Sequence, residues 1–180
     1  MYAVISKLDL ELSSRVKSLW QQLCITCGLK EIFLLPTPHF TWFLTEEMDV
    51  QKVVPLIEQI ALTNSSFSTH TFGLGIFTGE KPVLYLPIVK TEALIHLHND
   101  LWTQIQPYSD EIQSYYSPLL WVPHITLALK DLTRETLVCA VNEIAFEPIE
   151  LLVRVDNIAL AVYENEKTSE TLHTFQMKSE

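Results

Sequence analysis

The chain has 180 residues, enough for one domain or two small fused lobes with a sizeable core. Hydrophobic residues make up 48% of it and charged residues 19%, which excludes an intrinsically disordered chain. Twelve Lys and Arg against twenty-two Asp and Glu give a formal net charge of −10. Because proteins that grip long nucleic acids normally present a basic surface, we expect no such partner. A small phosphate substrate, or an RNA end held in a local pocket, remains compatible.

The cysteines and the N-terminal segment indicate the cellular compartment and whether a metal is bound. Cys24 and Cys27 form a C-x-x-C pair, but Cys139 stands alone and no second pair completes a zinc site. Both paired cysteines fall on the apolar stripe of a predicted helix, so we interpret them as core residues and expect no metal and no cofactor. The sparse count suits a reducing cytoplasm. No signal peptide and no apolar run of ~18 residues is present, so we expect a cytoplasmic, soluble monomer without membrane contact.

The predicted elements of the first half alternate strand and helix. A short apolar strand is expected over 2–8, followed by a helix that Gly28 ends. A second strand covers about 39–45, and Asp49 caps a second helix. The stretch 67–77 alternates enough to be a third strand, which gives the order β-α-β-α-β.

The second half begins with the same order. A strand is expected over 83–89, and Thr91 caps a helix. A polar, tyrosine-bearing loop over about 107–118 leads to a strand over 121–129, and Thr133 caps a further helix. The segments 149–155, 158–163 and 172–177 are predicted strands.

These orders predict a duplicated α+β fold in a single domain over 1–180, with pseudo-repeat halves of about 1–81 and 82–180. Each half starts with a strand and a long helix and then reaches a strand that begins with a histidine. Two lobes are expected, each an antiparallel sheet with helices on its outer face. Packing of the two sheets would leave an active-site groove between the lobes.

The two equivalent strands carry nearly the same string, Pro-His-Phe-Thr-Trp at 38–42 and Pro-His-Ile-Thr-Leu at 123–127. Residues two apart on a strand point to the same face, so each lobe would present one imidazole and one hydroxyl. Either motif alone is a weak signal, but equivalent placement in both halves makes the pair specific. The candidate catalytic residues are therefore His39 and His124, with Thr41 and Thr126 as phosphate binders.

Two imidazoles suit the cleavage of a phosphodiester. The attacking oxygen must lose a proton while the leaving oxygen gains one, and imidazoles with a pKa near 6.5 can do both at neutral pH. The threonine hydroxyls can donate hydrogen bonds to the non-bridging oxygens, where charge is held in the transition state. No metal is needed for this chemistry.

The paired motifs, their separation and the duplicated layout resemble the two-histidine (2H) phosphoesterase superfamily, with its 2′-5′ RNA ligase-like and cyclic phosphodiesterase families. The resemblance covers essentially the whole chain. It implies two similar lobes around a catalytic groove and hydrolysis of 2′,3′-cyclic phosphates of nucleotides or RNA ends. It also implies that His39 and His124 are the acid/base residues and that Thr41 and Thr126 bind phosphate.

One position departs from the family pattern. Many relatives have a basic residue in H-x-T-L-A-R, where this chain has Leu129, followed by Lys130. Lys130 has the strand parity of His124 but lies about 13 Å beyond Thr126 at ~3.3 Å per residue. The missing arginine disfavours tight binding of polymeric RNA. Two other functions stay open: a nucleotide- or phosphometabolite-binding module with little turnover, and a 2′-5′ RNA ligase or 2′-5′ phosphodiesterase.

A nucleobase needs an aromatic platform, because stacking contributes about 1–3 kcal/mol per base. Tyr115, Tyr116 and Trp121, in or near the loop before the second motif, are the candidates for base stacking. Packing of these rings on the core is an equally good interpretation, and Trp42 is expected to face inward. The remaining histidines lack the motif, and we interpret them as surface or hydrogen-bonded core residues, listed here: His70, His96, His98 and His173.

Overall fold

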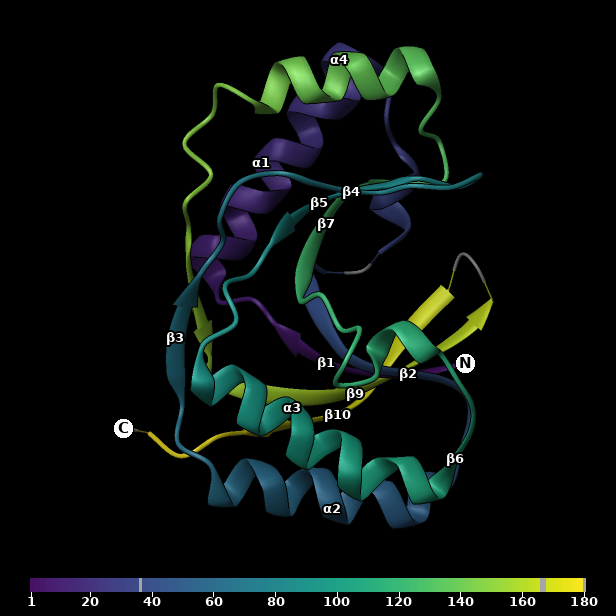
Figure 1. Ribbon diagram of the computed structural model, residues 1–180, viewed down its shortest axis with the longest axis vertical. Helices are drawn as coiled ribbons and strands as arrows, with labels where there is room; N and C mark the ends of the chain where they lie inside the picture. Colours follow the sequence, from purple (N-terminus) through teal and green to yellow (C-terminus); the bar gives the residue numbers. More distant parts are fainter. Residues whose placement is uncertain (36, 166–167, 180) are drawn as a thin grey trace.

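The computed structural model describes residues 1–35, 37–165 and 168–179. A five-stranded antiparallel sheet in the order β10-β9-β1-β2-β6 forms one layer of the molecule (Figure 1). Its strands are β1 (Tyr2–Lys7), β2 (His39–Met48), β6 (Ser109–Ile112), β9 (Asn157–Asn165) and β10 (Thr168–Gln176). Helices α2 (Val50–Thr63) and α3 (Glu92–Ile105) lie side by side and cover one face of this sheet.

A smaller sheet forms the other lobe. Its three antiparallel strands, in the order β4-β5-β7, are β4 (Gly75–Phe77), β5 (Val83–Pro87) and β7 (His124–Leu129). Helix α1 (Leu10–Cys27) contacts β7 and also α4 (Arg134–Ile144). A two-stranded pair of β3 (Phe67–His70) and β8 (Leu152–Val155) runs along one side of the molecule between the lobes. The predicted fold of two antiparallel sheets with outer helices is thus confirmed.

The predicted stop at Gly28 and the N-caps predicted for the other three helices are confirmed. Asp9 caps α1 by accepting a hydrogen bond from the Leu12 N–H, and Gly28 ends the helix at φ 75°, where a side chain would be strained. Asp49, Thr91 and Thr133 cap α2, α3 and α4 in the same way. These caps satisfy N–H groups that have no partner within the helix.

Two predicted elements were wrong because strand pairing depends on distant segments. The stretch 67–77 is not one strand: β3 pairs with β8, whereas β4 pairs with β5 in another sheet. The loop predicted over 107–118 contains β6, which adds to the edge of β2. It also holds two short 3-10 helices, Gln106–Tyr108 and Ser114–Tyr116.

The two lobes do not coincide with the two halves of the sequence. Strands β9 and β10 from the end of the chain complete the sheet that β1 and β2 begin. Helix α1 packs on the three-stranded lobe, and α3 packs beside α2 on the five-stranded one. One hydrophobic core therefore runs through both lobes, from Val4 and Trp42 to Leu127 and Ile144. Each lobe is built from both halves of the sequence, which ties the lobes together.

Cys27 at the end of α1 forms a disulfide with Cys139 on α4, across a sequence separation of 112 residues. Cys24 is the free cysteine. Cys27 packs against the core as predicted, but its disulfide with Cys139 was not foreseen, and Cys24 and Cys27 are not bonded to each other. Among the described residues, no helix is long and apolar enough to cross a membrane.

Candidate active site

The two motif histidines begin β2 and β7 and are held in the same way. The Nδ1 of His39 lies 2.8 Å from the Thr37 carbonyl oxygen, and the Nδ1 of His124 lies 2.7 Å from that of Val122. A carbonyl oxygen only accepts, so Nδ1 carries the hydrogen in both rings. Each imidazole is left with Nε2 as the atom that can take or give a proton.

The structure brings the two rings close together. Strands β2 and β7 contact each other across the lobes, and both histidines are half-buried. Burial lowers the pKa of His39, partly offset by its bond to Thr37. Burial also lowers the pKa of His124, and the charge of His39 lowers it further. Because the rings repel one another's charge, one neutral and one protonated imidazole is a favourable pairing.

Both motif threonines are fixed from behind by a tryptophan. The indole N–H of Trp121 donates to the Thr41 carbonyl oxygen at 2.9 Å, and that of Trp20 donates to the Thr126 carbonyl oxygen at 3.0 Å. Both tryptophans are buried. These equivalent hydrogen bonds hold each strand at the threonine that would bind phosphate. The two motifs are therefore alike in their tryptophan partners as well as in their own residues.

Two tyrosines surround the first motif. The hydroxyl of Tyr163, on β9, lies 3.4 Å from the Nε2 of His39 and can donate to it when the ring is neutral. The Tyr116 hydroxyl shares a hydrogen bond with the Thr41 side chain. Burial, with the nearby Tyr163, raises the pKa of Tyr116 to about 12, so its phenol stays protonated at neutral pH.

Aromatic rings surround the second motif instead. The ring centroids of Phe77 and Tyr85 lie 4.9 and 5.0 Å from that of His124. Phe77 and Tyr85 stack on each other at 4.1 Å. The two histidines therefore have matched backbones but different neighbours: hydrogen-bonding tyrosines lie near the first motif, whereas two stacked rings pack on His124.

The candidates for base stacking do not form a single platform. Trp121 is 2% exposed and lies parallel to the rings of His98 and Trp42, so that prediction was wrong. Tyr116 packs against the core and bonds Thr41. Tyr115 is 63% exposed, and its role stays a prediction.

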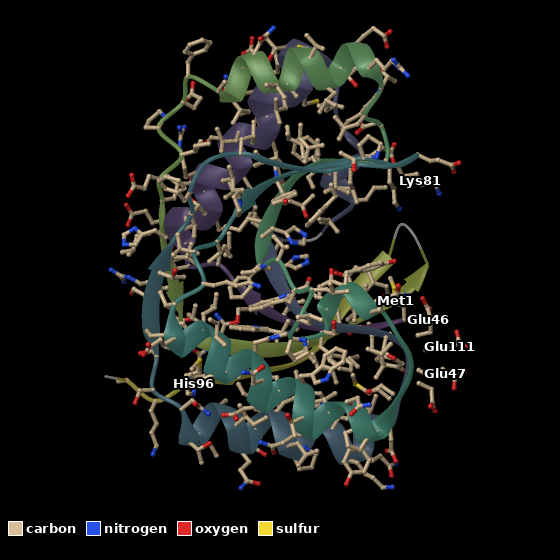
Figure 2. The ribbon with its side chains drawn as sticks, in the orientation of Figure 1. Met1, Glu46, Glu47, Lys81, His96 and Glu111 are labelled. Carbon is tan, nitrogen blue, oxygen red and sulfur yellow. A yellow bond between two sulfur atoms is a disulfide. The ribbon has the colours of Figure 1, made fainter. Side chains whose placement is uncertain are left out.

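The interpretation of the other histidines agrees with their surroundings. His98 is a buried residue whose Nε2 lies near the carbonyl oxygens of Trp42 and Tyr116. His70, His96 and His173 are exposed, and His96 lies on α3 (Figure 2). In the described part of the chain, no group of three or more His, Cys, Asp or Glu side chains could hold a metal ion.

The residues after the second motif also differ from the simple strand model. Strand β7 ends at Leu129, which packs against the core. Lys130 follows with φ 70°, so the alternation of the strand does not extend to it. The prediction that Lys130 shares the strand parity of His124 was therefore wrong.

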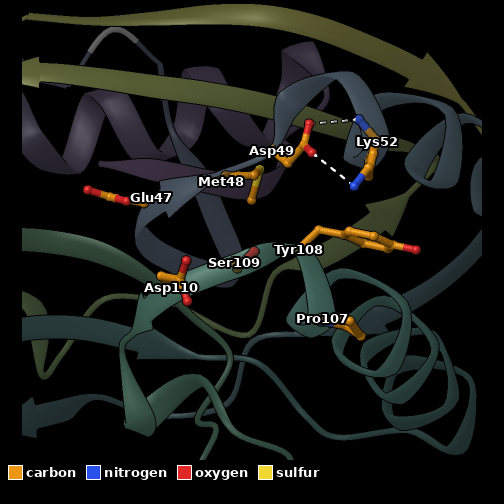
Figure 3. Close-up of a pocket in the computed structure, with 8 residues that line it drawn as sticks. All are labelled: Glu47, Met48, Asp49, Lys52, Pro107, Tyr108, Ser109 and Asp110. Carbon is orange, nitrogen blue, oxygen red and sulfur yellow. Dashed lines mark hydrogen bonds and ion pairs between the residues drawn. The ribbon is translucent and has the colours of Figure 1, made fainter.

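Several acidic side chains cluster at one edge of the larger sheet. Glu46, Glu47 and Glu111 gather at the β6 edge of the five-stranded sheet (Figure 2). Beside them is a hollow of about 370 Å³ lined by three carboxylates, those of Glu47, Asp49 and Asp110 (Figure 3). Its lysine, Lys52, is paired with Asp49 at 3.4 Å and lies over the Tyr108 ring. The three carboxylates of this hollow would repel a phosphate.

Comparison with known proteins identifies the family. The family model of the 2′-5′ RNA ligase superfamily matches residues 11–167. The chain belongs to this superfamily. A protein of Bacillus mycoides strain KBAB4, named provisionally as a phosphoesterase, is 29% identical over 102 residues. The match covers 53% of each protein, so the chain spans about half the length of this curated relative.

Solved structures show the same fold at low identity. TT0787 of Thermus thermophilus superposes with a TM-score of 0.73 at 19% identity, over 99% of this chain and 98% of the other. Escherichia coli LigT, in a crystal structure with 3′-AMP, superposes with a TM-score of 0.65 at 14% identity, over 98% and 97%. The fold predicted from the paired motifs is thus that of 2H phosphoesterases.

Sequence reasoning missed Tyr163, Phe77 and Tyr85. A faint signal existed for Tyr163, because Ala159 and Ala161 precede it at strand spacing and alternate with larger apolar residues. A face of alanines that ends in a tyrosine indicates that something packs or binds closely there. Phe77 and Tyr85 carried no such signal, because their nearness to His124 depends on the pairing of β4, β5 and β7.

Proposed function

We propose that the chain is a metal-independent phosphodiesterase that hydrolyses 2′,3′-cyclic phosphates of nucleotides or RNA ends, with His39 and His124 as the acid/base pair. One observation carries the proposal. Two imidazoles, each with Nδ1 bound to the carbonyl oxygen two residues earlier, lie close enough for the charge of one to lower the pKa of the other.

The reaction needs one proton taken and one proton given. One imidazole, neutral at Nε2, takes a proton from water as its oxygen attacks phosphorus. The bond from phosphorus to one ribose oxygen breaks, and the other imidazole, protonated at Nε2, gives that oxygen its proton. The hydroxyls of Thr41 and Thr126 bind the non-bridging oxygens, and the indoles behind them hold both strands in place.

Nucleotides are the natural substrate class to test, and the family name and one relative support this choice. LigT, whose fold this chain shares, has been crystallised with 3′-AMP. The phosphate of such a ligand matches the chemistry of two histidines and two threonines. The acidic surface at the β6 edge favours a small substrate over a long nucleic acid.

The test is product formation from the four nucleoside 2′,3′-cyclic phosphates with EDTA present. We expect turnover in the wild type and a loss of about 10²- to 10⁴-fold in His39→Ala and His124→Ala. His96→Ala, an exposed histidine on α3, is the matched control and should retain activity. No turnover in the wild type would refute the proposal, and 2′-5′-linked oligonucleotides, RNA ligation and nucleotide binding would then be measured.

A further inference from the structure

Phe77 and Tyr85 form an aromatic pair beside His124. The rings stack with centroids 4.1 Å apart and planes 25° apart, and Phe77 meets His124 edge to face at 82°. Phe77 is partly exposed, whereas Tyr85 is 8% exposed. Tyr85 is a buried core residue, whereas Phe77 is only partly buried, so part of the Phe77 ring stays accessible beside His124.

The chain makes room for this pair at Gly75. A Cβ at Gly75 would lie 2.3 Å from the Cζ of Tyr85, which no real contact permits. Gly75 is opposite Tyr85 across β4 and β5, and Tyr85 is opposite Thr126 across β5 and β7. Residues opposite one another share a sheet face, so the Tyr85 ring lies on the face of the second motif.

We propose that Phe77, backed by Tyr85, is the stacking platform for the nucleobase of a nucleotide substrate. This inference rests on the proposed function, because it assumes that phosphate binds at the histidine pair. In a nucleoside cyclic phosphate the base is one ribose ring away from phosphorus, and the Phe77 ring is 4.9 Å from that of His124. Tyr85 covers one face of Phe77 and holds it, which leaves the exposed part of that ring to a flat, apolar ligand.

The arrangement also replaces the platform expected from sequence. Trp121 is buried against His98, so its ring is not accessible to a base. The Tyr116 hydroxyl is hydrogen-bonded to Thr41. Stacking recognises any base by its π-face, so we expect a preference for a nucleoside over a substrate without a base. The site should therefore bind nucleotides generally and select against cyclic phosphates of simple polyols.

The experiment compares two substrates with the same five-membered cyclic phosphate, adenosine 2′,3′-cyclic phosphate and glycerol 1,2-cyclic phosphate. The measured quantity is the ratio of their kcat/KM values. In Phe77→Leu we expect this ratio to fall about 5- to 20-fold, and in Phe77→Trp to be retained. Phe146→Leu, which removes a ring that is 92% exposed in the turn after α4, should keep the wild-type ratio. A ratio within twofold of the wild type in Phe77→Leu would overturn the inference.

A binding measurement separates this inference from the proposed function. Adenosine 2′-monophosphate is titrated calorimetrically into the wild type, Phe77→Leu and Gly75→Ala, each checked for folding by thermal melting. We expect the Kd to rise about 5- to 20-fold in Phe77→Leu, and also to rise in Gly75→Ala, where the new methyl displaces the Tyr85 ring. If neither cyclic phosphate is hydrolysed but these Kd values rise, the proposed hydrolysis fails and the platform stands. Unchanged Kd values would refute the platform whatever the turnover.

Discussion

Replacing Trp20 with phenylalanine tests whether the indole behind the second motif stabilises it. Trp20 is 2% exposed, packs edge to face on Phe33 at 6.1 Å, and donates its N–H to the Thr126 carbonyl oxygen. Trp20→Phe keeps an aromatic ring in the core but removes the donor. The substitution therefore keeps an apolar ring in the core but removes the hydrogen bond to the Thr126 carbonyl oxygen.

The expected cost has two parts. A carbonyl that loses its buried partner costs about 1–3 kcal/mol. The smaller ring also leaves a small cavity, for about 1 kcal/mol. Together these predict a loss of about 3 kcal/mol in the free energy of unfolding, or roughly 6–12 °C in Tm for a chain of this size.

The assay is urea denaturation together with kcat/KM on a nucleoside 2′,3′-cyclic phosphate. Trp102→Phe is the matched control, because Trp102 is partly buried and packs on Phe43 at 5.2 Å, without a hydrogen bond from its indole to any described residue. We expect Trp102→Phe to cost about 1 kcal/mol and to leave kcat/KM near the wild-type value. Equal losses of stability in both variants would refute the role assigned to the bond between Trp20 and Thr126.

Three further predictions concern the chemistry and the crosslink. Burial lowers the pKa of both motif histidines, so the protonated acid is lost as the pH rises through a pKa below 6.5. We therefore expect log kcat/KM to fall by about one per pH unit between pH 7 and 9. A flat or rising profile in this range would contradict the mechanism. Thr41→Val keeps the side-chain shape but removes the hydroxyl, and should lower kcat by about 10²-fold or more. The Tyr116 hydroxyl also loses its hydrogen-bond partner, which should cost about 1–3 kcal/mol of stability. A change in KM alone would show that the Thr41 hydroxyl serves only ground-state binding. The double variant Cys27→Ser/Cys139→Ser removes a crosslink that spans 112 residues, and its free energy of unfolding should fall by at most about 4–5 kcal/mol. Identical denaturation midpoints for the oxidised wild type and the variant would show that the crosslink does not form in solution.

Local patterns were enough to predict the helices, their caps and the two motif strands. Capping by Asp49, Thr91 and Thr133, like the stop at Gly28, depends on backbone groups within a few residues. The shared face of a histidine and a threonine two positions apart follows from the geometry of a single strand. Because the string occurs twice at equivalent positions, the sequence also predicted a paired site and the superfamily to which the chain belongs.

Only the tertiary structure decided which strands share a sheet and which side chains surround each histidine. Strands β9 and β10 join β1 and β2 across most of the chain, and this places Tyr163 beside His39. The pairing of β4, β5 and β7 places Phe77 and Tyr85 beside His124, and helix packing brings Cys27 to Cys139. These contacts join segments with no shared periodicity, and their free energy comes from burial that exists only once the sheets have formed. The sequence alone therefore predicted the candidate pair of histidines, and the fold determined the different surroundings of its two members.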